Sequence, residues 1–464
     1  MLELRRVFNW LSLASFHGAG NEQVSAVCTD SRAIEPGSLF VALRGERFDA
    51  HDFVAGARAA GAAAVMVERW VSGVTAPVIR VPDTRRALGE IARGWRSQFR
   101  LPLVAVTGSN GKTTVKEMIA SILAAAAGAD ARLATRGNLN NEVGVPLTLL
   151  RLSGAHRYAV IELGMNHPGE IAWLAAIAQP TVALVNNAQR EHQEFMAGVE
   201  ATARENGSVF SALGERACAV FPGDDALHTP IWRTLAAPHR TIEFGLAADG
   251  RGVDGGTLAV SAAPDARPEG FEIRVGSASA RVALAIDGAH NVRNALAAAA
   301  CSHAAGIALV DIVRGLEAFR PAPGRLVRHC LANGASLIDD SYNANPDSVL
   351  AAIALLQALP APRVLVLGDM GEVGENGPVW HREVGEFAAR AGIDHLLLAG
   401  SATRETAHGY GPRAEHFGDD IEALAARAST LATPKATLLV KGSRFMRMER
   451  VVHALGVSNG SGAH

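Results

Sequence analysis

The sequence contains few cysteines, and none of them lie in a paired motif. Its four cysteines, Cys28, Cys218, Cys301 and Cys330, are scattered over 464 residues and form no Cys-x-x-Cys pair. Neither a structural zinc site nor a disulfide framework is therefore expected, and the pattern fits a reducing compartment.

The sequence also lacks an excess of charge and a long apolar run. The formal net charge is −2, so no basic field is present to hold nucleic acid. The N-terminal stretch at residues 7–16 is interrupted by polar residues, and it is too short for a membrane span and poor as a signal peptide. We expect an amphipathic first helix there, no membrane span, a cytoplasmic location and a monomer.

What is present is the composition of a globular enzyme. Hydrophobic residues make up 48% of the chain and charged residues 19%, which is ordinary for a protein with full-sized cores. The length suggests two to four domains.

The most informative stretch is a glycine turn between a predicted strand at residues 101–106 and a predicted helix at residues 115–127. The turn and the helix start are formed by Gly108, Ser109, Asn110, Gly111, Lys112, Thr113 and Thr114. Its glycines and the helix N-terminus allow backbone N–H groups to face an anion. We expect Lys112 to reach the terminal phosphates of a nucleotide and Thr113 to bind Mg²⁺. The full Walker A spacing would place a glycine at Val106, so this is a shortened form of the loop.

Residues 1–83 are predicted to form a small β/α domain without a catalytic constellation. Two short strands flank a turn at residues 34–37, and a helix capped near Asp49 precedes another strand. Ser31 and Arg32 follow the first of these strands and could hold a diphosphate, because an arginine fork matches phosphate oxygens. A capped turn with a surface arginine explains these two residues equally well.

Residues 84–321 are predicted to form a central α/β domain. Glu162 ends an apolar strand, where open α/β sheets bind ligands, and is a candidate Mg²⁺ ligand. His192 follows the next strand and is either a second metal ligand or a helix cap. The pattern at residues 250–286 indicates short strands separated by Gly, Pro and Ser turns. It predicts an antiparallel sheet packed against the first sheet of this domain.

Several polar side chains in this central region have two readings. The amides of Asn138, Asn140 and Asn141 either bond a substrate or form a loop. His290 and Asn291, at the start of a predicted helix, either contact a base or cap the helix.

Residues 322–464 are predicted to form a doubly wound, Rossmann-like domain. Strands are expected at residues 336–339, 363–367, 395–398 and 436–440, with helices after Pro346, Pro378 and Asp419. Polar clusters follow three of these strands, at residues 340–346, 368–372 and 441–444. Strand ends of one sheet share an edge, so the clusters should converge on one site. Residues 458–464 should form a disordered tail.

Together these residues resemble the Mur ligases, the ATP-dependent enzymes that add amino acids to the UDP-muramyl peptide of bacterial cell walls. The run TGSNGKTT is similar to the ATP loop of this family, and Glu162 and His192 match its two magnesium-binding positions. The run DGAHNVRN, which holds His290, Asn291 and Asn294, is similar to its adenine-contacting segment. Arg325 lies in the Pro-Gly-Arg of its C-terminal domain, and the resemblance also assigns Asp340 to the ATP site. It implies ATP and Mg²⁺ as cofactors and catalytic roles for Lys112, Glu162 and His192.

The branch of the family that attaches D-alanyl-D-alanine is the most similar. It is indicated by Asp30-Ser31-Arg32 with Pro36-Gly37, by the asparagine run at residues 138–141, by DSYNANP and by LGDMGE. The resemblance implies that UDP-muramyl-tripeptide and D-alanyl-D-alanine are the substrates, joined through an acyl phosphate. The implied substrate-binding residues are Ser31, Arg32, Asn138, Asn140, Asn141, Tyr342, Asn343, Asn345, Asp369, Met370 and Lys441. The Asp-Asn-Pro-Arg signature of the ligase that adds the third residue is absent. The alternatives are a ligase with another acceptor and a nucleotide-driven switch.

One position departs from the family pattern. Many Mur ligases carry a carbamoylated lysine about fourteen residues past the histidine, and that register falls at Asn206 here. Either Glu205 or Asn206 takes over as ligand or bridge, or the second metal is held without this lysine.

Overall fold

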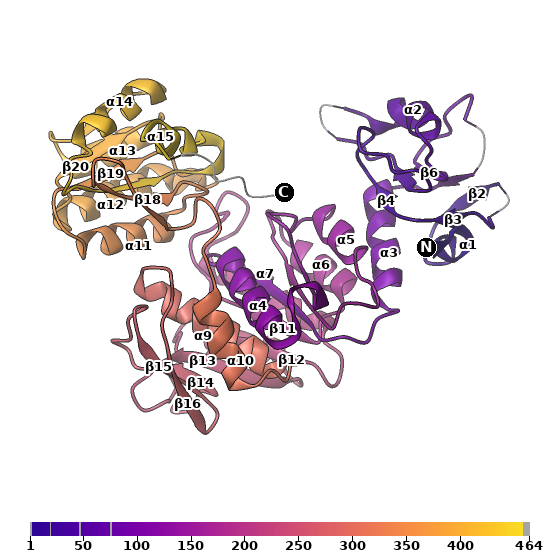
Figure 1. Ribbon diagram of the computed structural model, residues 1–464, viewed down its shortest axis with the longest axis horizontal. Helices are drawn as coiled ribbons and strands as arrows, with labels where there is room; N and C mark the ends of the chain where they lie inside the picture. The colour runs from indigo at the N-terminus through magenta and orange to yellow at the C-terminus, as the bar shows by residue number, and fades with distance from the viewer. Residues whose placement is uncertain (1, 19, 46–47, 75–76, 458–464) are drawn as a thin grey trace.

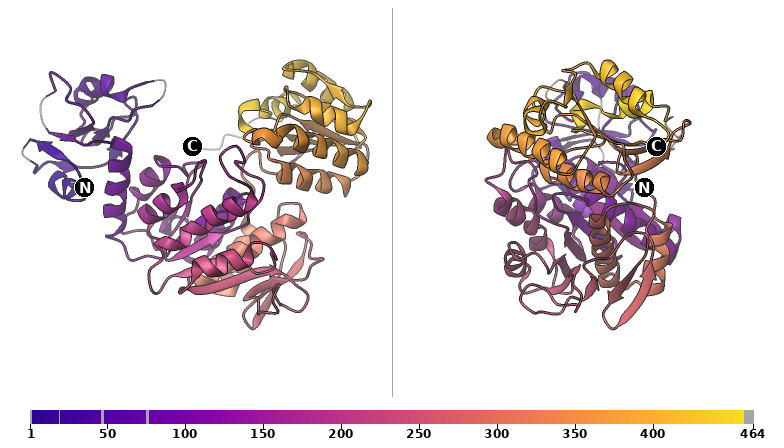
Figure 2. Two further views of the ribbon diagram at one scale, coloured as in Figure 1. Left: turned by 180° about the vertical axis from the view of Figure 1, so that it is seen from behind. Right: turned by 90° about the vertical axis from the view of Figure 1, so that its left-hand side faces the viewer.

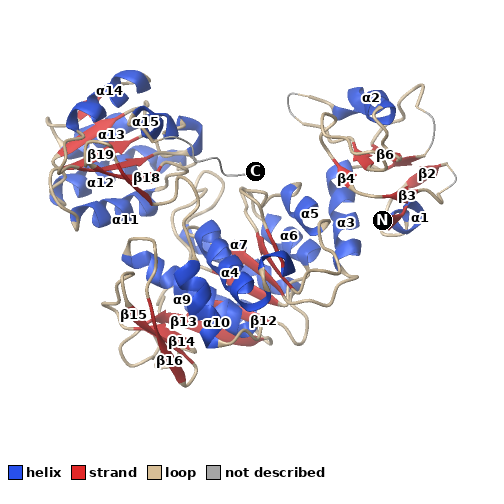
Figure 3. Ribbon diagram, in the orientation of Figure 1, coloured by secondary structure: helices blue, strands red, loops and turns tan. Residues whose placement is uncertain are grey.

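The computed structural model describes residues 2–18, 20–45, 48–74 and 77–457. The predicted tail at residues 458–464 lies outside this part of the chain. Three large sheets follow one another along the sequence, each with helices against it (Figures 1 and 3). The first and the last sheet lie at opposite ends of the molecule, and the central sheet lies between them, as the view from behind in Figure 2 also shows.

The N-terminal part is built on a five-stranded sheet in the order β2-β7-β6-β5-β4. Its strands are β2 (Ser15–His17), β4 (Val27–Cys28), β5 (Leu39–Val41), β6 (Ala64–Val67) and β7 (Val78–Arg80). A two-stranded sheet of β1 (Leu2–Glu3) and β3 (Gln23–Val24), the helices α1 (Leu4–Phe8) and α2 (Val54–Ala59), and the 3₁₀ turn η1 (Ala50–Phe53) complete it. The two strands predicted around the turn at residues 34–37 are confirmed as β4 and β5.

The predicted amphipathic first helix is present, with Leu4 and Val7 buried, but it is shorter than residues 7–16 and begins earlier. Helix α1 ends at Phe8, with Asn9 as its C-cap. Beyond it, Ser12 donates from its backbone N–H and its hydroxyl to Glu90, at 2.9 and 2.6 Å. The chain then extends into β2, where Phe16 pairs with Ile79. Polar contacts and strand pairing with distant residues therefore replace the local helix.

The central part is a nine-stranded sheet in the order β16-β15-β14-β13-β12-β11-β8-β10-β9. Its strands are β8 (Leu103–Thr107), β9 (Arg132–Ala134), β10 (Tyr158–Glu162), β11 (Val182–Val185), β12 (Cys218–Pro222), β13 (Arg240–Leu246), β14 (Val260–Ala262), β15 (Phe271–Val275) and β16 (Ala278–Val282). Its helices are α3 (Thr84–Arg96), α4 (Lys112–Ala127), α5 (Gly144–Leu149), α6 (Glu170–Ala178), α7 (Val199–Gly207), α8 (Thr229–Ala236), α9 (Ala289–Ala304) and α10 (Leu309–Ala318), with the 3₁₀ turns η2 (Ala129–Ala131) and η3 (Ser208–Ala212).

Strand β8 shows how this sheet is covered on both faces. Val104 and Val106 pack in one core with α4, α9 and α10, whereas Leu103 and Ala105 pack in the other core with α3, α6 and α8. Alternate residues of a strand point to opposite faces, and here both faces are apolar, which is why the strand reads as a continuous hydrophobic run.

The prediction of a second sheet packed against the first was wrong. Strands β14, β15 and β16 are antiparallel to one another, as expected, but they extend the same sheet. The link is β13, which the sequence analysis did not identify, and which pairs in parallel with both β12 and β14. Because the open edge of β13 accepts β14, the antiparallel strands continue the sheet sideways.

The C-terminal part is a six-stranded sheet in the order β17-β18-β22-β19-β20-β21, parallel except for β17. Its strands are β17 (Val327–Cys330), β18 (Ser336–Asp340), β19 (Arg363–Leu367), β20 (His395–Leu398), β21 (Glu415–His416) and β22 (Thr437–Lys441). Helices α11 (Pro346–Gln357), α12 (Gly377–Arg390), α13 (Thr403–Tyr410), α14 (Ile421–Leu431) and α15 (Glu449–Ala454) and the 3₁₀ turns η4 (Gly374–Asn376) and η5 (Arg444–Met446) accompany it. The predicted doubly wound sheet is confirmed.

No helix in the described ranges is both long enough and apolar enough to cross a bilayer.

Candidate active site

A cavity of about 1410 Å³ lies between the central and C-terminal parts. It is lined by residues 109–114 of the glycine turn and helix start at residues 108–114, called the phosphate loop below, and by residues 186–192 of the loop after β11. The start of α9 and the strand ends of the C-terminal sheet complete the lining. Of the residues predicted to bind ligands, it is lined by Ser109, Asn110, Gly111, Lys112, Thr113, Thr114, Asn138, Asn140, Asn141, Glu162, His192, His290, Asn291, Asn294, Arg325, Asp340, Tyr342, Asn343, Asn345 and Lys441. A cavity at the carboxyl ends of parallel strands is where open α/β sheets bind ligands.

The phosphate loop has backbone geometry that only glycine allows. Gly108 has φ +132° and Gly111 has φ +79°. A Cβ at Gly111 would lie 2.6 Å from Asn294 Oδ1, and one at Gly108 would lie 3.0 Å from the backbone nitrogen of Asn187. Gly111 is also the N-cap of α4, so Lys112 begins the helix and its N-terminus faces the cavity. This arrangement is a ready site for phosphate.

Lys112 is held in place by the protein itself. Its ammonium donates to the carbonyl oxygens of Gly108 and Ser109, at 2.7 and 3.0 Å, and to Glu191 Oε1 at 2.7 Å. The side chain is only 15% exposed. Its charge is therefore paired with Glu191 and positioned over the loop in which a phosphate would sit.

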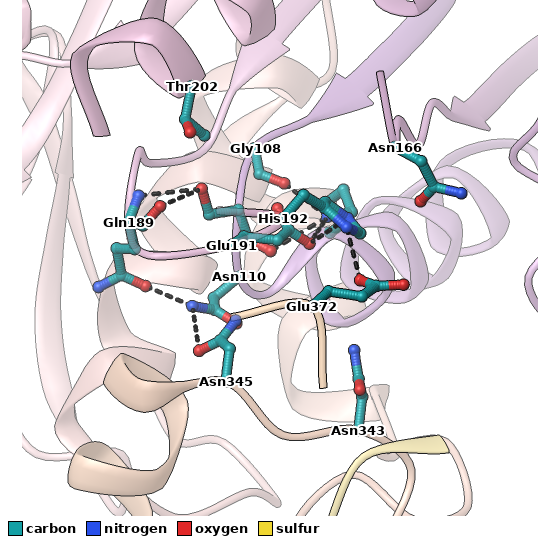
Figure 4. A network of polar contacts seen from close by, with 12 residues as sticks. Gly108, Asn110, Asn166, Gln189, Glu191, His192, Thr202, Asn343, Asn345 and Glu372 are labelled. Carbon is teal, nitrogen blue, oxygen red and sulfur yellow. Dashed lines mark hydrogen bonds and ion pairs between the residues drawn. The ribbon is translucent and has the colours of Figure 1, made fainter. Parts of the chain in front are cut away.

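The loop after β11 braces the phosphate loop from one side (Figure 4). Asn187 Oδ1 accepts a hydrogen bond from the backbone N–H of Asn110 at 2.8 Å. Gln189 accepts from the Asn110 side chain at 2.6 Å and donates its backbone N–H to the Ser109 hydroxyl at 2.9 Å. Asn110 also forms a hydrogen bond with Asn345 of the C-terminal part, at 2.9 Å. The phosphate loop and the loop after β11 therefore form one polar unit that extends to the third sheet.

Glu162 has the free oxygen that a cation needs. One carboxylate oxygen accepts from the Asn140 amide at 2.8 Å, and the other is buried without a hydrogen-bond partner. Thr113 lines the same cavity. Within the described residues, no group of three or more His, Cys, Asp and Glu side chains gathers as a metal cage. This donor set suits Mg²⁺, which usually takes one or two carboxylates together with phosphate oxygens and water.

His192 lies between two carboxylates. Its Nε2 is 3.5 Å from Glu191 Oε1, and its Nδ1 is 2.6 Å from Glu372 Oε2 of the C-terminal part. Burial of the ring disfavours the charged form, but these carboxylates outweigh burial and raise the pKa of His192 to about 9. The residue has φ +51°, so the backbone is strained to aim the ring into the cavity. The structure shows no helix cap by this histidine.

The start of α9 forms a chain of amides that leads to the phosphate loop. Asn291 donates to the carbonyl of Asp287 at 2.6 Å and accepts from Asn294 at 2.8 Å. Asn294 in turn accepts from Asn186 at 3.0 Å. Next to this chain, burial and the charge of Lys441 lower the pKa of His290 to about 4, so the ring is neutral near pH 7. A neutral imidazole and fixed amides suit a heterocyclic base.

The predicted convergence of the three C-terminal clusters is confirmed. Lys441 donates to Asp340 at 2.6 Å and to the carbonyl of Asn343 at 2.9 Å. The Ser443 hydroxyl donates to the carbonyl of Ala344 at 2.9 Å and accepts from the backbone N–H of Gly371 at 2.7 Å. Burial raises the pKa of Asp340, although Lys441 acts in the opposite direction.

Tyr342, which follows β18, forms cation–π contacts with two arginines. The guanidinium of Arg325 stacks over its ring at 4.1 Å from the centroid, and that of Arg444 lies 5.8 Å away. A cation over an aromatic face holds both side chains at the mouth of the cavity.

Five predicted site residues do not line the cavity: Gly108 of the phosphate loop, Ser31, Arg32, Asp369 and Met370. Asp369 and Met370 are buried behind the cavity, and Asp369 accepts from the backbone N–H groups of Ser401 and Thr403 at 3.0 and 2.8 Å. Ser31 and Arg32 lie in the N-terminal part, away from this cavity, where Arg32 is paired with Asp30 at 2.7 Å.

Neither residue suggested in place of the carbamoylated lysine reaches the cavity. Asn206 is fully buried, accepts from the Thr107 hydroxyl at 2.6 Å and donates to the carbonyl of Thr202 at 3.0 Å. Glu205 accepts from the backbone N–H of Ile171, at the start of α6. The suggestion that one of them serves as a metal ligand is therefore not supported. Both side chains form hydrogen bonds that hold α7 in place.

Three residues that directly precede His192 were not predicted to belong to the site: Gln189, Arg190 and Glu191. Their signal was their position, a polar run at the end of a buried strand, and it was used for the histidine alone. Arg190 binds Asp347 and Glu383 of the C-terminal part, a contact across more than 150 residues that no local pattern reveals.

Comparison with known families places the whole chain in one group. Residues 23–96 match the model described as "Mur ligase family, catalytic domain", residues 106–302 the "Mur ligase middle domain", and residues 324–444 the "Mur ligase, glutamate ligase domain".

Similar proteins and structures carry more specific names. The chain is 43% identical, over 93% of its length and 94% of the relative, to "UDP-N-acetylmuramoyl-tripeptide--D-alanyl-D-alanine ligase" of Escherichia coli (strain K12). A crystal structure of MurF from Acinetobacter baumannii is 35% identical with a TM-score of 0.88, covering 97% of this chain and 98% of the other. The MurF ligase from Thermotoga maritima in complex with ADP is 27% identical with a TM-score of 0.81, covering 93% and 96%.

Proposed function

The chain belongs to the Mur ligase family, and we propose that it joins D-alanyl-D-alanine to UDP-N-acetylmuramoyl-tripeptide with the hydrolysis of ATP to ADP. The product is the UDP-muramyl-pentapeptide of peptidoglycan precursor synthesis. Because ATP and UDP-linked sugars are made inside the cell, the cytoplasm is the location that fits this reaction.

One observation carries the proposal. A single cavity is lined both by the phosphate loop with Lys112 and by the converging C-terminal clusters with Lys441 and Tyr342. An ATP site alone would need only the first set of residues. The second set lines the same cavity as the phosphate loop and supplies polar groups for an acceptor, as an ATP-driven ligase requires.

The chemistry begins with two anions that repel each other. A carboxylate is a poor electrophile, so a tripeptide carboxylate oxygen must first attack the γ-phosphate of ATP, forming an acyl phosphate and releasing ADP. The amine of the dipeptide then attacks the acyl carbon, inorganic phosphate leaves, and the amine loses a proton. Positioning and charge stabilisation dominate catalysis of such phosphoryl transfers.

Lys112 is placed to stabilise the charge of the γ-phosphate. At rest its ammonium is paired with Glu191, and exchange of this carboxylate for phosphate oxygens keeps the lysine neutralised throughout. The loop N–H groups and the α4 N-terminus add positive potential without any rearrangement.

Glu162 and Thr113 fit a Mg²⁺ ion, because Glu162 presents a buried, unpartnered oxygen towards the nucleotide end of the cavity. When bound there, Mg²⁺ supplies Lewis-acid neutralisation of the phosphates. His192 carries its own positive charge between Glu191 and Glu372, and its role as a second metal ligand would require loss of the ring proton.

The experiment is a measurement of ADP release with UDP-muramyl-tripeptide and a panel of acceptors. We expect release with D-alanyl-D-alanine and none above background with D-glutamate, lysine or diaminopimelate. Efficient ligation of a free amino acid would assign the chain to another acceptor, and ADP release independent of any acceptor would indicate a nucleotide-driven switch.

A further inference from the structure

Arg190, in the loop after β11 of the central part, makes several polar contacts with the C-terminal part. The proposed chemistry gives this residue no role. Its Nε and Nη2 donate to Asp347 Oδ1 at 3.0 and 2.7 Å, and its backbone N–H donates to Oδ2 at 2.7 Å. Its Nη1 donates to Glu383 at 2.6 Å. Its guanidinium also lies over the Trp380 ring, 5.6 Å from the centroid.

These partners belong to two helices of the C-terminal part. Asp347 lies in the first turn of α11, within the capping box formed by Asn345 and Ser348, and Glu383 and Trp380 lie on α12. One arginine fork therefore binds both helices. The Arg190 side chain is only 19% exposed and that of Asp347 23%, so the pair is shielded far better than an ordinary surface ion pair.

The neighbours of Arg190 in the sequence contact the phosphate loop and the C-terminal part. Gln189 holds Asn110, Glu191 holds Lys112, and His192 contacts Glu372. Four consecutive residues thus alternate between the phosphate loop and the C-terminal part. Among the described residues, this loop also contacts the C-terminal part through the His192–Glu372 ion pair and through a hydrogen bond from the backbone N–H of Glu194 to the carbonyl of Glu372, at 3.3 Å.

We propose that Arg190 is a positioning residue of the ligase. By binding Asp347, Glu383 and Trp380, it docks α11 and α12 on the loop after β11. This docking sets the acceptor end of the cavity at its working distance from Lys112 and His192. The inference rests on the proposed function for its kinetic part only, because the docking contacts are made within the chain itself.

The test compares Arg190→Met, which keeps the stem and removes the fork, with Arg204→Met as the matched control. Arg204 pairs with Glu200 on the same exposed helix face. We expect Arg190→Met to raise KM for D-alanyl-D-alanine at least about tenfold, because a shielded ion pair across an interface is lost. KM for the UDP-tripeptide should stay within about twofold, since its nucleotide end binds elsewhere. Small-angle X-ray scattering of the ligand-free variant should show a larger radius of gyration than wild type.

One further variant, Glu383→Gln, keeps the test decisive if Arg190→Met folds poorly, and a double variant tests the pairing where Arg190→Met folds. Glu383→Gln should shift both readouts in the same direction but less, and Asp347→Asn combined with Arg190→Met should be no worse than Arg190→Met alone. Scattering and KM values identical to those of Arg204→Met would overturn the proposal. If the wild type makes no product with the dipeptide, the proposed function fails, while the scattering comparison still decides whether Arg190 docks the two parts.

Discussion

Among single residues, Lys112 is the one that we propose to act most directly on ATP. It is the ammonium that the structure places over the phosphate loop, bonded to the carbonyls of Gly108 and Ser109. Lys112→Ala should lower kcat at least about a thousandfold, because a preorganised charge at the reacting phosphate is removed. Turnover is measured as ADP release, with Lys435→Ala as the control at an exposed lysine. Near-normal turnover by a folded Lys112→Ala protein is incompatible with the phosphate-cradle assignment.

His290 gives a prediction for pH. Burial and Lys441 lower its pKa to about 4 from an ordinary value of 6.5, so the folded protein holds the ring neutral at pH 5.5. Because the folded pKa lies below the unfolded one, His290 leaves stability unaffected above pH 6.5 and reduces it as the pH falls towards 4. Proton NMR titration should show one histidine resonance, absent in His290→Gln, that does not titrate between pH 5.5 and 8. A midpoint near 6.5 for that resonance would contradict the assignment.

How far the site could be predicted also differs from residue to residue. Lys112, Thr113 and Glu162 lie in local patterns whose geometry follows from strand, turn and helix, and the structure brings them to one cavity. Glu191 and Arg190 bind partners 79 and 157 positions away, and such pairings depend on the tertiary fold. Asp369 shows the opposite error, since a polar residue at a strand end turned out to hold the backbone of Ser401.

At the scale of elements, the site depends on how α10 packs on α4, the helix that begins with Lys112. Gly315 of α10 lies so close to α4 that a Cβ would be 2.3 Å from the Cα of Ile122, and the Ser121 hydroxyl bonds its carbonyl at 2.7 Å. Gly315→Ala should therefore lower the free energy of unfolding by roughly 1–3 kcal/mol through overpacking.

The matched control is Gly56→Ala, in helix α2, where a Cβ would meet nothing within 4 Å. That change should leave stability the same or raise it by up to about 1 kcal/mol, since alanine favours helix over glycine. Urea unfolding of both variants is the measurement. Equal stability of Gly315→Ala and wild type would show that the α4–α10 crossing is looser than described.

Elements were predicted well where one periodicity ran through a segment and poorly where pairing decided. The strands at residues 363–367 and 395–398 were located to the residue. Strand β13 was not predicted, and the continuity of the nine-stranded sheet was therefore not predicted either. The first two residues of β13, Arg240 and Thr241, are exposed and weaken its apolar pattern.

At the scale of the whole molecule, the strands of the N-terminal sheet contribute no residue to the lining of the central cavity. Arg32 is highly exposed and lies away from the central cavity, with its fork paired only to Asp30 nearby. If this part holds the UDP end of the substrate, Arg32→Ala should raise KM for the UDP-tripeptide several-fold and leave KM for ATP unchanged. Steady-state kinetics with Arg5→Ala as the control decide it. An unchanged KM for the UDP-tripeptide would return Arg32 to a surface turn.

The central claim is that this cavity joins the two substrates through an acyl phosphate, and oxygen tracing tests it most directly. The tripeptide carboxylate is labelled with ¹⁸O, and the enzyme turns over with ATP and D-alanyl-D-alanine. Because that carboxylate oxygen attacks the γ-phosphate and leaves with it, each released phosphate should carry one label, and one pentapeptide should form per phosphate, as read by mass spectrometry. Unlabelled phosphate, or labelled phosphate without pentapeptide, would contradict the account.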